Sequence, residues 1–483
     1  MRTATVVGSG PNGLAGAVRL AQAGLRVTVL EGADEIGGGT RSGELSVPGV
    51  IHDHCSAFHP LGAASPYLTT LPLHRYGLRW RWADIDCAHP LDDGTAALLY
   101  RDLDRTVEEL GADGARWRSL VGPLAGDFGA LADEILQPVA HLPRHPITLS
   151  RFGLRALAPA DRTARRFETA AAQGLFTGIA AHAFTRLDRP GTAAAGLMLA
   201  AAGHHAGWPV AEGGSAAITR ALAALLHDLG GTVRTGVPVT DIAEIPSDLV
   251  LLDVMPDAAA RILGGTLPSR VSRAFRRYPR GPAAFKVDYV IDGDVGWAAP
   301  GCARAGTVHL GGTTGEIAAA ESSVVAGRMP DRPFTLVGQQ WLADPGRATG
   351  NLRPLWAYAH VPNGYPDTDR AVAAVTAQID RFAPGFSDRI VDVRPTPPAA
   401  LASANPNYRG GDIGGGRNDL WHLVARPRST LHPYATGVDG VFLCSAATPP
   451  GGGVHGMCGF RAAEAALAAT NGDVRRPRPR RTA

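Results

Sequence analysis

The sequence contains almost no lysine. Lys286 is the only lysine among 47 basic residues, and all the others are arginine. A GC-rich genome replaces lysine wherever either residue serves, so a lone lysine can mark a position where a guanidinium would not serve. The basic residues nearly balance 44 acidic ones, for a formal net charge of +3. This balance excludes a general nucleic-acid-binding surface, and we expect no nucleic-acid partner.

Cysteine is also scarce. The five cysteines are scattered, and none lies in a Cys-x-x-Cys pair or close to a histidine set with metal-ligand spacing. The pattern excludes a disulfide framework, a redox-active dithiol and a structural zinc site. We therefore expect no metal.

Long hydrophobic runs are missing as well. Apolar stretches such as Gly191–Gly203 are too short to cross a bilayer, and the first residues lack a basic and apolar signal segment. These observations predict a cytoplasmic protein. A length of 483 residues with 45% hydrophobic content predicts two or more globular domains.

The first thirty residues predict a strand, a helix and a second strand. Thr3–Val7 and Arg26–Leu30 are short apolar runs typical of buried parallel strands. Asn12–Ala23, between them, has apolar residues at helical spacing. The three segments form a βαβ unit, which is the context in which a glycine-rich turn binds a dinucleotide.

The turn between the first strand and the helix has the spacing G-x-G-x-x-G. The first glycine permits the tight turn, the second lets the backbone approach a pyrophosphate, and the third allows close packing of helix and strand. The phosphates would lie at the helix N-terminus. The residues expected to contact the cofactor here are Gly8, Gly10, Pro11, Asn12 and Gly13.

Glu31 follows the second strand, 18 residues after Gly13. A carboxylate at this position accepts hydrogen bonds from the ribose hydroxyls and repels a 2′-phosphate. The ligand is therefore FAD or NAD, and NADP is excluded.

The segment after Glu31 favours FAD. GADEIGGGTRSGEL brings a second glycine cluster, with Gly38 and Gly39, and then Arg41, which can reach cofactor phosphates. A plain loop is the alternative. With its strand, helix, acid, glycine cluster and arginine, the sequence resembles flavoproteins of the amine oxidase and phytoene desaturase group.

A second resemblance lies near the C-terminus. Val441–Cys444 predicts a strand, Thr448–Gly453 a turn, and the residues from Gly456 a helix. This run resembles the C-terminal flavin-binding signature of phytoene-desaturase-like oxidoreductases. The resemblance places four further residues at the flavin: Gly451, Gly452, Gly453 and Val454.

The middle of the chain supplies another expected piece. Thr232–Thr235 and Val237–Ile242 read as short strands, and Ser247–Pro256 reads as an apolar strand. In the resembling family this block returns to the nucleotide domain, and the residue matching Val239 meets the adenine with its backbone. Thr307–Ala320 mimics a nucleotide turn, but its spacing is G-G-x-x-G and no second βαβ unit follows, so we expect no NAD(P)H domain.

The resemblance implies an α/β, two-domain flavoprotein that is discontinuous in sequence. A Rossmann-like domain would bind FAD non-covalently, and a substrate domain would combine an antiparallel sheet with helices. The basic end of the chain is expected to be a disordered tail. The predicted limits are 1–60, 205–265 and 410–470 for the FAD-binding domain, 61–204 and 266–409 for the substrate domain, and 471–483 for the tail.

Three residues are candidates for the chemistry. Phe285–Trp297 resembles the amine oxidase strand that presents a lysine to flavin N5 through a water, and Lys286 takes the matching place. An ordinary exposed lysine is the alternative. His59 and His455 are candidates for lining the flavin or substrate pocket. The spacing of His59 with two upstream histidines is not diagnostic of a metal site.

The expected activity is hydride transfer from a hydrophobic small molecule, isoprenoid or carotenoid in the first instance, to flavin N5. Oxygen or a quinone would accept the electrons. Oxidation of an amine or a natural product is an alternative on the same fold, and a non-catalytic prenyl or lipid carrier is an alternative of another class. The arginines of Arg151–Arg166 allow peripheral membrane contact, although a solvated helix face is the favoured explanation of them. The oligomeric state does not follow from the sequence.

Overall fold

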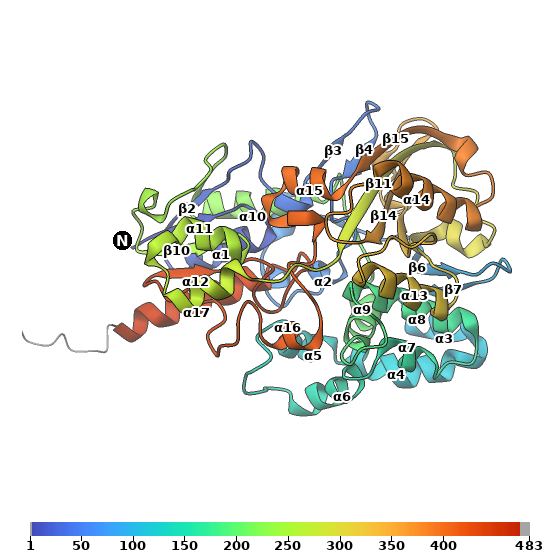
Figure 1. Ribbon diagram of the computed structural model, residues 1–483, viewed down its shortest axis with the longest axis horizontal. Helices are drawn as coiled ribbons and strands as arrows, with labels where there is room; N and C mark the ends of the chain where they lie inside the picture. The colour runs from blue at the N-terminus through green and yellow to red at the C-terminus, as the bar shows by residue number, and fades with distance from the viewer. Residues whose placement is uncertain (1, 474–483) are drawn as a thin grey trace, which may run out of the picture.

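The computed structural model describes residues 2–473 and is built around two large sheets (Figure 1). A five-stranded sheet lies toward the end that holds the N-terminus, and a seven-stranded sheet lies toward the other. Among the described residues, no helix combines the length and apolar character needed to cross a bilayer.

All neighbouring strands of the five-stranded sheet are parallel, in the order β16-β10-β1-β2-β9. Its strands are short and apolar, as expected for a sheet covered on both faces. They come from three separate parts of the sequence: β1 Thr3–Val7, β2 Arg26–Leu30, β9 Thr232–Arg234, β10 Leu249–Leu252 and β16 Val441–Leu443.

Helices cover both faces of this sheet. α1 (Pro11–Gln22), α10 (Ala216–Asp228) and α17 (Met457–Asp473) pack into the largest hydrophobic core. α11 (Pro256–Leu263) and α12 (Ser269–Arg276) cover the opposite face and form a separate core. The arrangement is doubly wound, so the carboxyl ends of the parallel strands lie open for a ligand.

The seven-stranded sheet has the order β15-β11-β14-β13-β12-β6-β7 and is antiparallel except for the parallel pair β6 and β12. Its strands are β6 Ile85–Pro90, β7 Ala96–Leu99, β11 Ala283–Asp292, β12 Ala305–Leu310, β13 Thr335–Gly338, β14 Leu352–Val361 and β15 Ile390–Thr396.

The two faces of this sheet differ in character. On β11, Phe285 and Val287 point into an apolar core that also contains residues of α14 (Thr368–Phe382). Lys286 and Asp288 alternate with them and so occupy the other face. α8 (Ala170–Ala180) contacts β6, β7 and β12.

The remaining elements connect these layers. The helices are α2 Pro60–Ala63, α3 Leu103–Glu109, α4 Gly114–Gly126, α5 Phe128–Ile135, α6 Pro146–Ala156, α7 Ala160–Ala164, α9 Ala193–Ala206, α13 Thr314–Val325, α15 Pro398–Ala404 and α16 Leu420–Val424. The short strands are β3 Ser42–Glu44, β4 Ile51–Asp53, β5 Trp80–Arg81 and β8 Val210–Ala211.

The structure confirms the predicted fold class, with a parallel Rossmann-like sheet and a separate, largely antiparallel sheet. The strand predicted at Val237–Ile242 is wrong. Pro238 lacks the N–H that a strand ladder needs, and an Asp241/Glu244 capping box starts a 3₁₀ turn, Ile242–Glu244. α17 continues to Asp473, past the predicted start of the tail, and 474–483 lie outside the described residues. The domain limits stay a prediction.

Candidate cofactor site

A cavity of about 710 Å³ opens at the carboxyl ends of β1, β2 and β10. This volume lies within the range of small-molecule and cofactor sites, and the place is the one where doubly wound sheets bind their ligands. Residues predicted to bind the cofactor line it from two distant parts of the chain: Gly8, Gly10, Pro11, Asn12, Glu31, Gly38, Gly39, Arg41 and Val239.

The glycine-rich turn has the backbone that its sequence predicts. Gly8 has φ +101°, and a Cβ added to Gly13 would lie 2.1 Å from the carbonyl oxygen of Gly8. Gly13 therefore does not line the cavity but lets α1 close onto the turn. Gly10 precedes α1 without a side-chain cap, so the helix presents its N-terminus to the cavity.

Glu31 organises the wall beside this turn. Its Oε2 accepts hydrogen bonds from the Ser9 N–H at 2.9 Å and the Ser9 hydroxyl at 2.6 Å, and its Oε1 accepts from the Ala33 N–H at 2.9 Å. The carboxylate is thus fixed in direction at the end of β2. Oε2 already accepts two hydrogen bonds, whereas Oε1 retains a lone pair for a ligand hydroxyl.

The second glycine cluster lies against a segment from far along the chain. Arg41 donates to the carbonyls of Glu35 at 2.9 Å and Ala404 at 3.1 Å, and it lies 3.8 Å from Oε1 of Glu31. A Cβ on Gly39 would lie 2.0 Å from the hydroxyl oxygen of Tyr408. Only glycine fits there without displacing the phenol.

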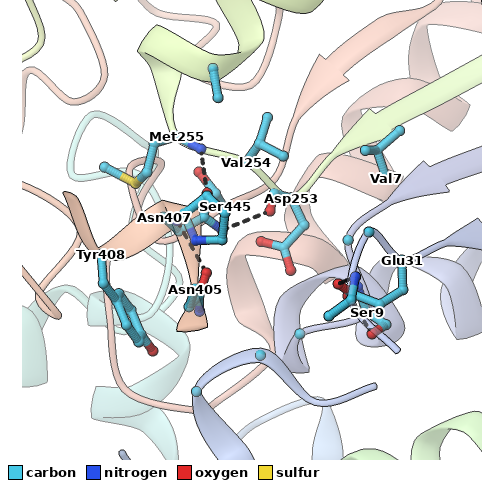
Figure 2. A pocket seen from close by; sticks show the side chains of 18 of the residues that line it. Val7, Ser9, Glu31, Asp253, Val254, Met255, Asn405, Asn407, Tyr408 and Ser445 are labelled. Carbon is cyan, nitrogen blue, oxygen red and sulfur yellow. Dashed lines mark hydrogen bonds between the residues drawn. The ribbon is translucent and has the colours of Figure 1, made fainter. Parts of the chain in front are cut away.

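Asp253 lines the cavity and was not predicted. It follows β10, where Figure 2 shows it, and its Oδ2 accepts a hydrogen bond from the Gly13 N–H at 2.9 Å. Burial raises the pKa of Asp253 to about 7, and the nearby Glu31 carboxylate contributes to the rise. Its position directly after an apolar parallel strand could have identified it, because such residues face the ligand crevice.

Asn405–Tyr408 forms the opposite wall and was also missed. Asn407 accepts a hydrogen bond from the Met255 N–H at 2.9 Å and donates to the Asp253 carbonyl at 3.0 Å, as Figure 2 shows. Tyr408 lies at the edge of the same cavity. No signal in the sequence ties this distant segment to β10.

The C-terminal turn lies beyond this cavity. Ser445 and Ala446, which follow β16, line the cavity. The predicted flavin contacts of the turn do not line it: Gly451, Gly452, Gly453 and Val454. The turn is tight: Gly451 and Gly453 have φ +116° and +139°, and Val454 has φ +54°. These four residues stay predicted flavin contacts.

The two candidate histidines are buried and do not line the cavity. His59 bonds Ser215 Oγ through Nε2 at 2.8 Å, and His455 accepts from the Met457 N–H through Nδ1 at 3.0 Å. Burial lowers the pKa of each imidazole to about 4, so both are neutral at pH 7. His455 caps α17, and neither has the pKa of a base poised near neutrality.

Lys286 is buried, with an exposed fraction of 3%, which excludes the alternative of an ordinary exposed lysine. Its ammonium forms an ion pair with Asp288, whose other oxygen lies 3.3 Å from Nδ1 of His52. The three side chains form a buried polar cluster where β11 meets β4. A contact with flavin stays a prediction.

His52 and His59 do not lie together in one cluster. His52 bonds Asp288 and His59 bonds Ser215. Within residues 2–473, no group of three or more histidine, cysteine, aspartate or glutamate side chains has the geometry to hold a metal ion.

Comparisons of sequence find matches to parts of the chain. Residues 6–71 match the NAD(P)-binding Rossmann-like domain. A stretch of 137 residues is 31% identical to one of the subunits of limonene dehydrogenase from Castellaniella defragrans. That stretch is 28% of this chain and covers 24% of the length of that protein.

Comparisons of structure extend over nearly the whole chain. An oxidoreductase from Methanosarcina mazei superposes with a TM-score of 0.60 at 15% identity, covering 97% of this chain and 100% of that one. Putrescine oxidase bound to putrescine gives a TM-score of 0.59 at 18% identity, covering 97% and 99%. The chain therefore shares its overall fold with these oxidoreductases.

Proposed function

We propose that the chain is an FAD-dependent oxidoreductase that moves hydride from an apolar small molecule to flavin N5. The observation that carries the proposal is the cavity itself. It joins the N-terminus of α1, the Glu31 carboxylate and Val239 at the carboxyl ends of parallel strands. These are the elements that bind an extended dinucleotide.

The residues fit the ADP part of FAD. Gly8 and Gly10 keep the turn free of side chains where the pyrophosphate would lie, and a Cβ at Gly10 would lie 2.9 Å from Oδ2 of Asp253. Glu31 would accept from the ribose hydroxyls, and the backbone of Val239 would meet the adenine. Bound FAD supplies a hydride acceptor. Along the second glycine cluster, Gly38 and Gly39 would let the rest of the cofactor pass close to the backbone.

The substrate class is inferred from two supports. The sequence resembles phytoene-desaturase-like enzymes at its C-terminal turn, and part of the chain is related to a component of limonene dehydrogenase. Both favour an isoprenoid hydrocarbon or a simple derivative of one. Lys286, held by Asp288, would present its ammonium at the cofactor end of the substrate site.

Amine oxidation is the second candidate because the chain shares its fold with putrescine oxidase. The amine oxidases that the sequence resembles usually frame the flavin with two aromatic side chains, for which Trp421 and Tyr434 would be the candidates here. Trp421 is 64% exposed, and Tyr434 is buried with its hydroxyl donating to the Pro449 carbonyl. A terpenoid substrate is therefore favoured.

The test is anaerobic mixing of the FAD-loaded protein with panels of monoterpenes, longer isoprenoids and primary amines, followed by flavin absorbance. We expect bleaching with an isoprenoid and none with amines. Bleaching with amines alone would assign the second candidate. Flavin that binds but is bleached by no member would refute the proposed substrate classes, and a failure to bind flavin would favour the carrier.

A further inference from the structure

The face of the seven-stranded sheet that carries Lys286 also carries two histidines from neighbouring strands. In the strand register, Lys286 pairs with Tyr358 and Ala284 pairs with His360, two residues farther along β14. On β13, Leu336 pairs with Tyr358 of β14 on one side and with His309 of β12 on the other. Because paired residues lie on the same face of a sheet, His309 shares the face of Lys286. On this face, polar side chains therefore lie among residues of the largest hydrophobic core, such as Leu336 and Tyr358, whereas the opposite face is a separate apolar core.

His360 forms a fully buried pair with Glu321 of α13, which contacts β14. Nδ1 of His360 lies 2.7 Å from Oε1 of Glu321. Among residues 2–473, neither Nε2 of His360 nor Oε2 of Glu321 has a hydrogen-bond partner. A buried polar atom without a partner costs about 1–3 kcal/mol, so two adjacent ones indicate a position for a polar ligand group.

Aromatic rings enclose this pair. The ring centroids of Phe184, Phe334 and Tyr358 lie 3.8, 5.3 and 5.7 Å from that of His360. Phe184 holds its place with φ +51°, a left-handed backbone that a bulky residue adopts at a cost of about 1–2 kcal/mol. Strained residues of this kind cluster at ligand sites. The pair is thus a polar centre inside an apolar wall.

We propose that Glu321 and His360 bind the hydroxyl group of an otherwise apolar substrate, at the end of the substrate site away from the cofactor. This rests on the proposed function. A neutral His360 that donates through Nδ1 accepts through Nε2, and a protonated one donates through Nε2, while Oε2 of Glu321 accepts in both cases. Beside a protonated His360, one hydroxyl satisfies both atoms, because it accepts from Nε2 and donates to Oε2 of Glu321. Beside a neutral His360, it donates to one of the two. A hydrocarbon satisfies neither atom.

The distance along β14 between the position of Lys286 and His360 is comparable to the length of a small substrate. Asp288 pairs with Trp356, whose indole N–H donates to the Cys55 carbonyl, so this end of the sheet lies against the segment that follows β4. His360 lies two residues from Tyr358 in the opposite direction, about 7 Å along the strand. A monocyclic terpene alcohol is long enough to span this distance between a ring carbon and its hydroxyl.

The test compares limonene with α-terpineol, which has a similar carbon skeleton and one hydroxyl, by calorimetric titration of FAD-loaded protein. The wild type should bind α-terpineol at least about tenfold more tightly than limonene. Glu321→Gln and His360→Gln should each remove most of this preference by lowering the affinity for α-terpineol more than the affinity for limonene. Flavin absorbance of the same samples reports cofactor loading.

The matched control is Glu134→Gln. Glu134 is also a buried carboxylate bonded to a histidine, at 2.5 Å from His141, but it lies in α5, apart from the seven-stranded sheet. This variant should keep the wild-type preference. Equal affinities in the wild type, binding of neither ligand, or a preference that survives both variants would overturn the proposal. Discrimination without any flavin would uphold the hydroxyl site and refute the proposed function.

Discussion

Asp253 places a carboxyl group where the two negative phosphates of the proposed cofactor would lie. It occupies the Gly13 N–H at the N-terminus of α1, and burial raises its pKa to about 7. Below pH 7 the group is mostly neutral and compatible with a pyrophosphate. Above pH 7 it is mostly ionised and repels the phosphates.

FAD affinity should therefore fall as the pH rises through about 7. We expect binding to weaken about tenfold between pH 6 and pH 8.5 in the wild type, and Asp253→Asn should remove this dependence. Flavin fluorescence titrations at both pH values check it. Asp248→Asn changes an exposed carboxyl just before β10 and should behave as the wild type. An unchanged pH profile in Asp253→Asn would show that another group controls binding.

Gly39 lies in close contact with one side chain from a distant segment, that of Tyr408. An alanine Cβ would lie 2.0 Å from the Tyr408 hydroxyl oxygen but 3.2 Å from the ring carbon that carries it. Gly39→Ala should weaken FAD binding about tenfold or more, because either Tyr408 or the glycine cluster must move. Adding Tyr408→Phe should restore most of the affinity. Additive losses in a double-mutant cycle would contradict this contact.

At the level of elements, the first helix of the nucleotide-binding unit, α1, packs directly against the last helix, α17, at a glycine of α17. α1 and α17 cross so closely that a Cβ on Gly459 would lie 1.7 Å from the Asn12 carbonyl oxygen and 2.9 Å from the Gly16 nitrogen. This crossing sets the C-terminal turn beside the N-terminal one. The contact is with backbone, so no side-chain rotation can relieve a clash.

Gly459→Ala should lower the melting temperature and FAD affinity together, with a loss of stability of about 1–3 kcal/mol or more. Gly153→Ala is the matched control, because Gly153 also lies inside a helix and a Cβ there meets nothing within 4 Å. The control should be neutral or slightly stabilising. Equal melting temperatures for the two variants would refute the account of the crossing.

A second junction depends on charge. Arg347, fully buried, pairs with Asp53 of β4 at 2.5 Å and Asp344 at 3.1 Å, and it donates to the Ala211 carbonyl at 2.7 Å. Burial raises the pKa of Asp53, but Arg347 and hydrogen bonds from Ser215 and Ser42 outweigh it and leave the pKa lowered. The pair therefore stabilises the fold above pH about 4, and this contribution is lost as the pH falls below that value.

Arg347→Met should cost about 3–5 kcal/mol at pH 7, because it leaves a buried carboxylate without its partner. The difference from the wild type should narrow at pH 3, as Asp53 takes up a proton. Denaturant unfolding at both pH values measures it. Arg370→Met removes an exposed pair with Asp331 and should cost less than about 1 kcal/mol. A cost for Arg347→Met no larger than this control would refute the role of the junction.

For the whole molecule, the sequence predicts those strands and site residues that are determined by a local pattern or a fixed spacing along the chain. β1 and β2 have the predicted bounds, and the glycine turn, Glu31 and Val239 meet at one cavity. Asn405–Tyr408 could not be predicted, because its place depends on hydrogen bonds to β10 across some 150 residues of chain. The strand predicted at Val237–Ile242 is wrong for a local reason. The alternation of apolar residues favours a strand, but Pro238 and the capping box that starts at Asp241 oppose it.

The central claim is that this chain holds FAD in the cavity between α1, Glu31 and Val239. The most direct measurement is the cofactor released by denaturing the purified protein after incubation with FAD, NAD and NADP together. The account predicts one FAD per chain in the wild type and a clear loss of FAD in Gly10→Ala, whose added Cβ lies 2.9 Å from Oδ2 of Asp253. Protein that releases no flavin, or that retains NAD in its place, would contradict it.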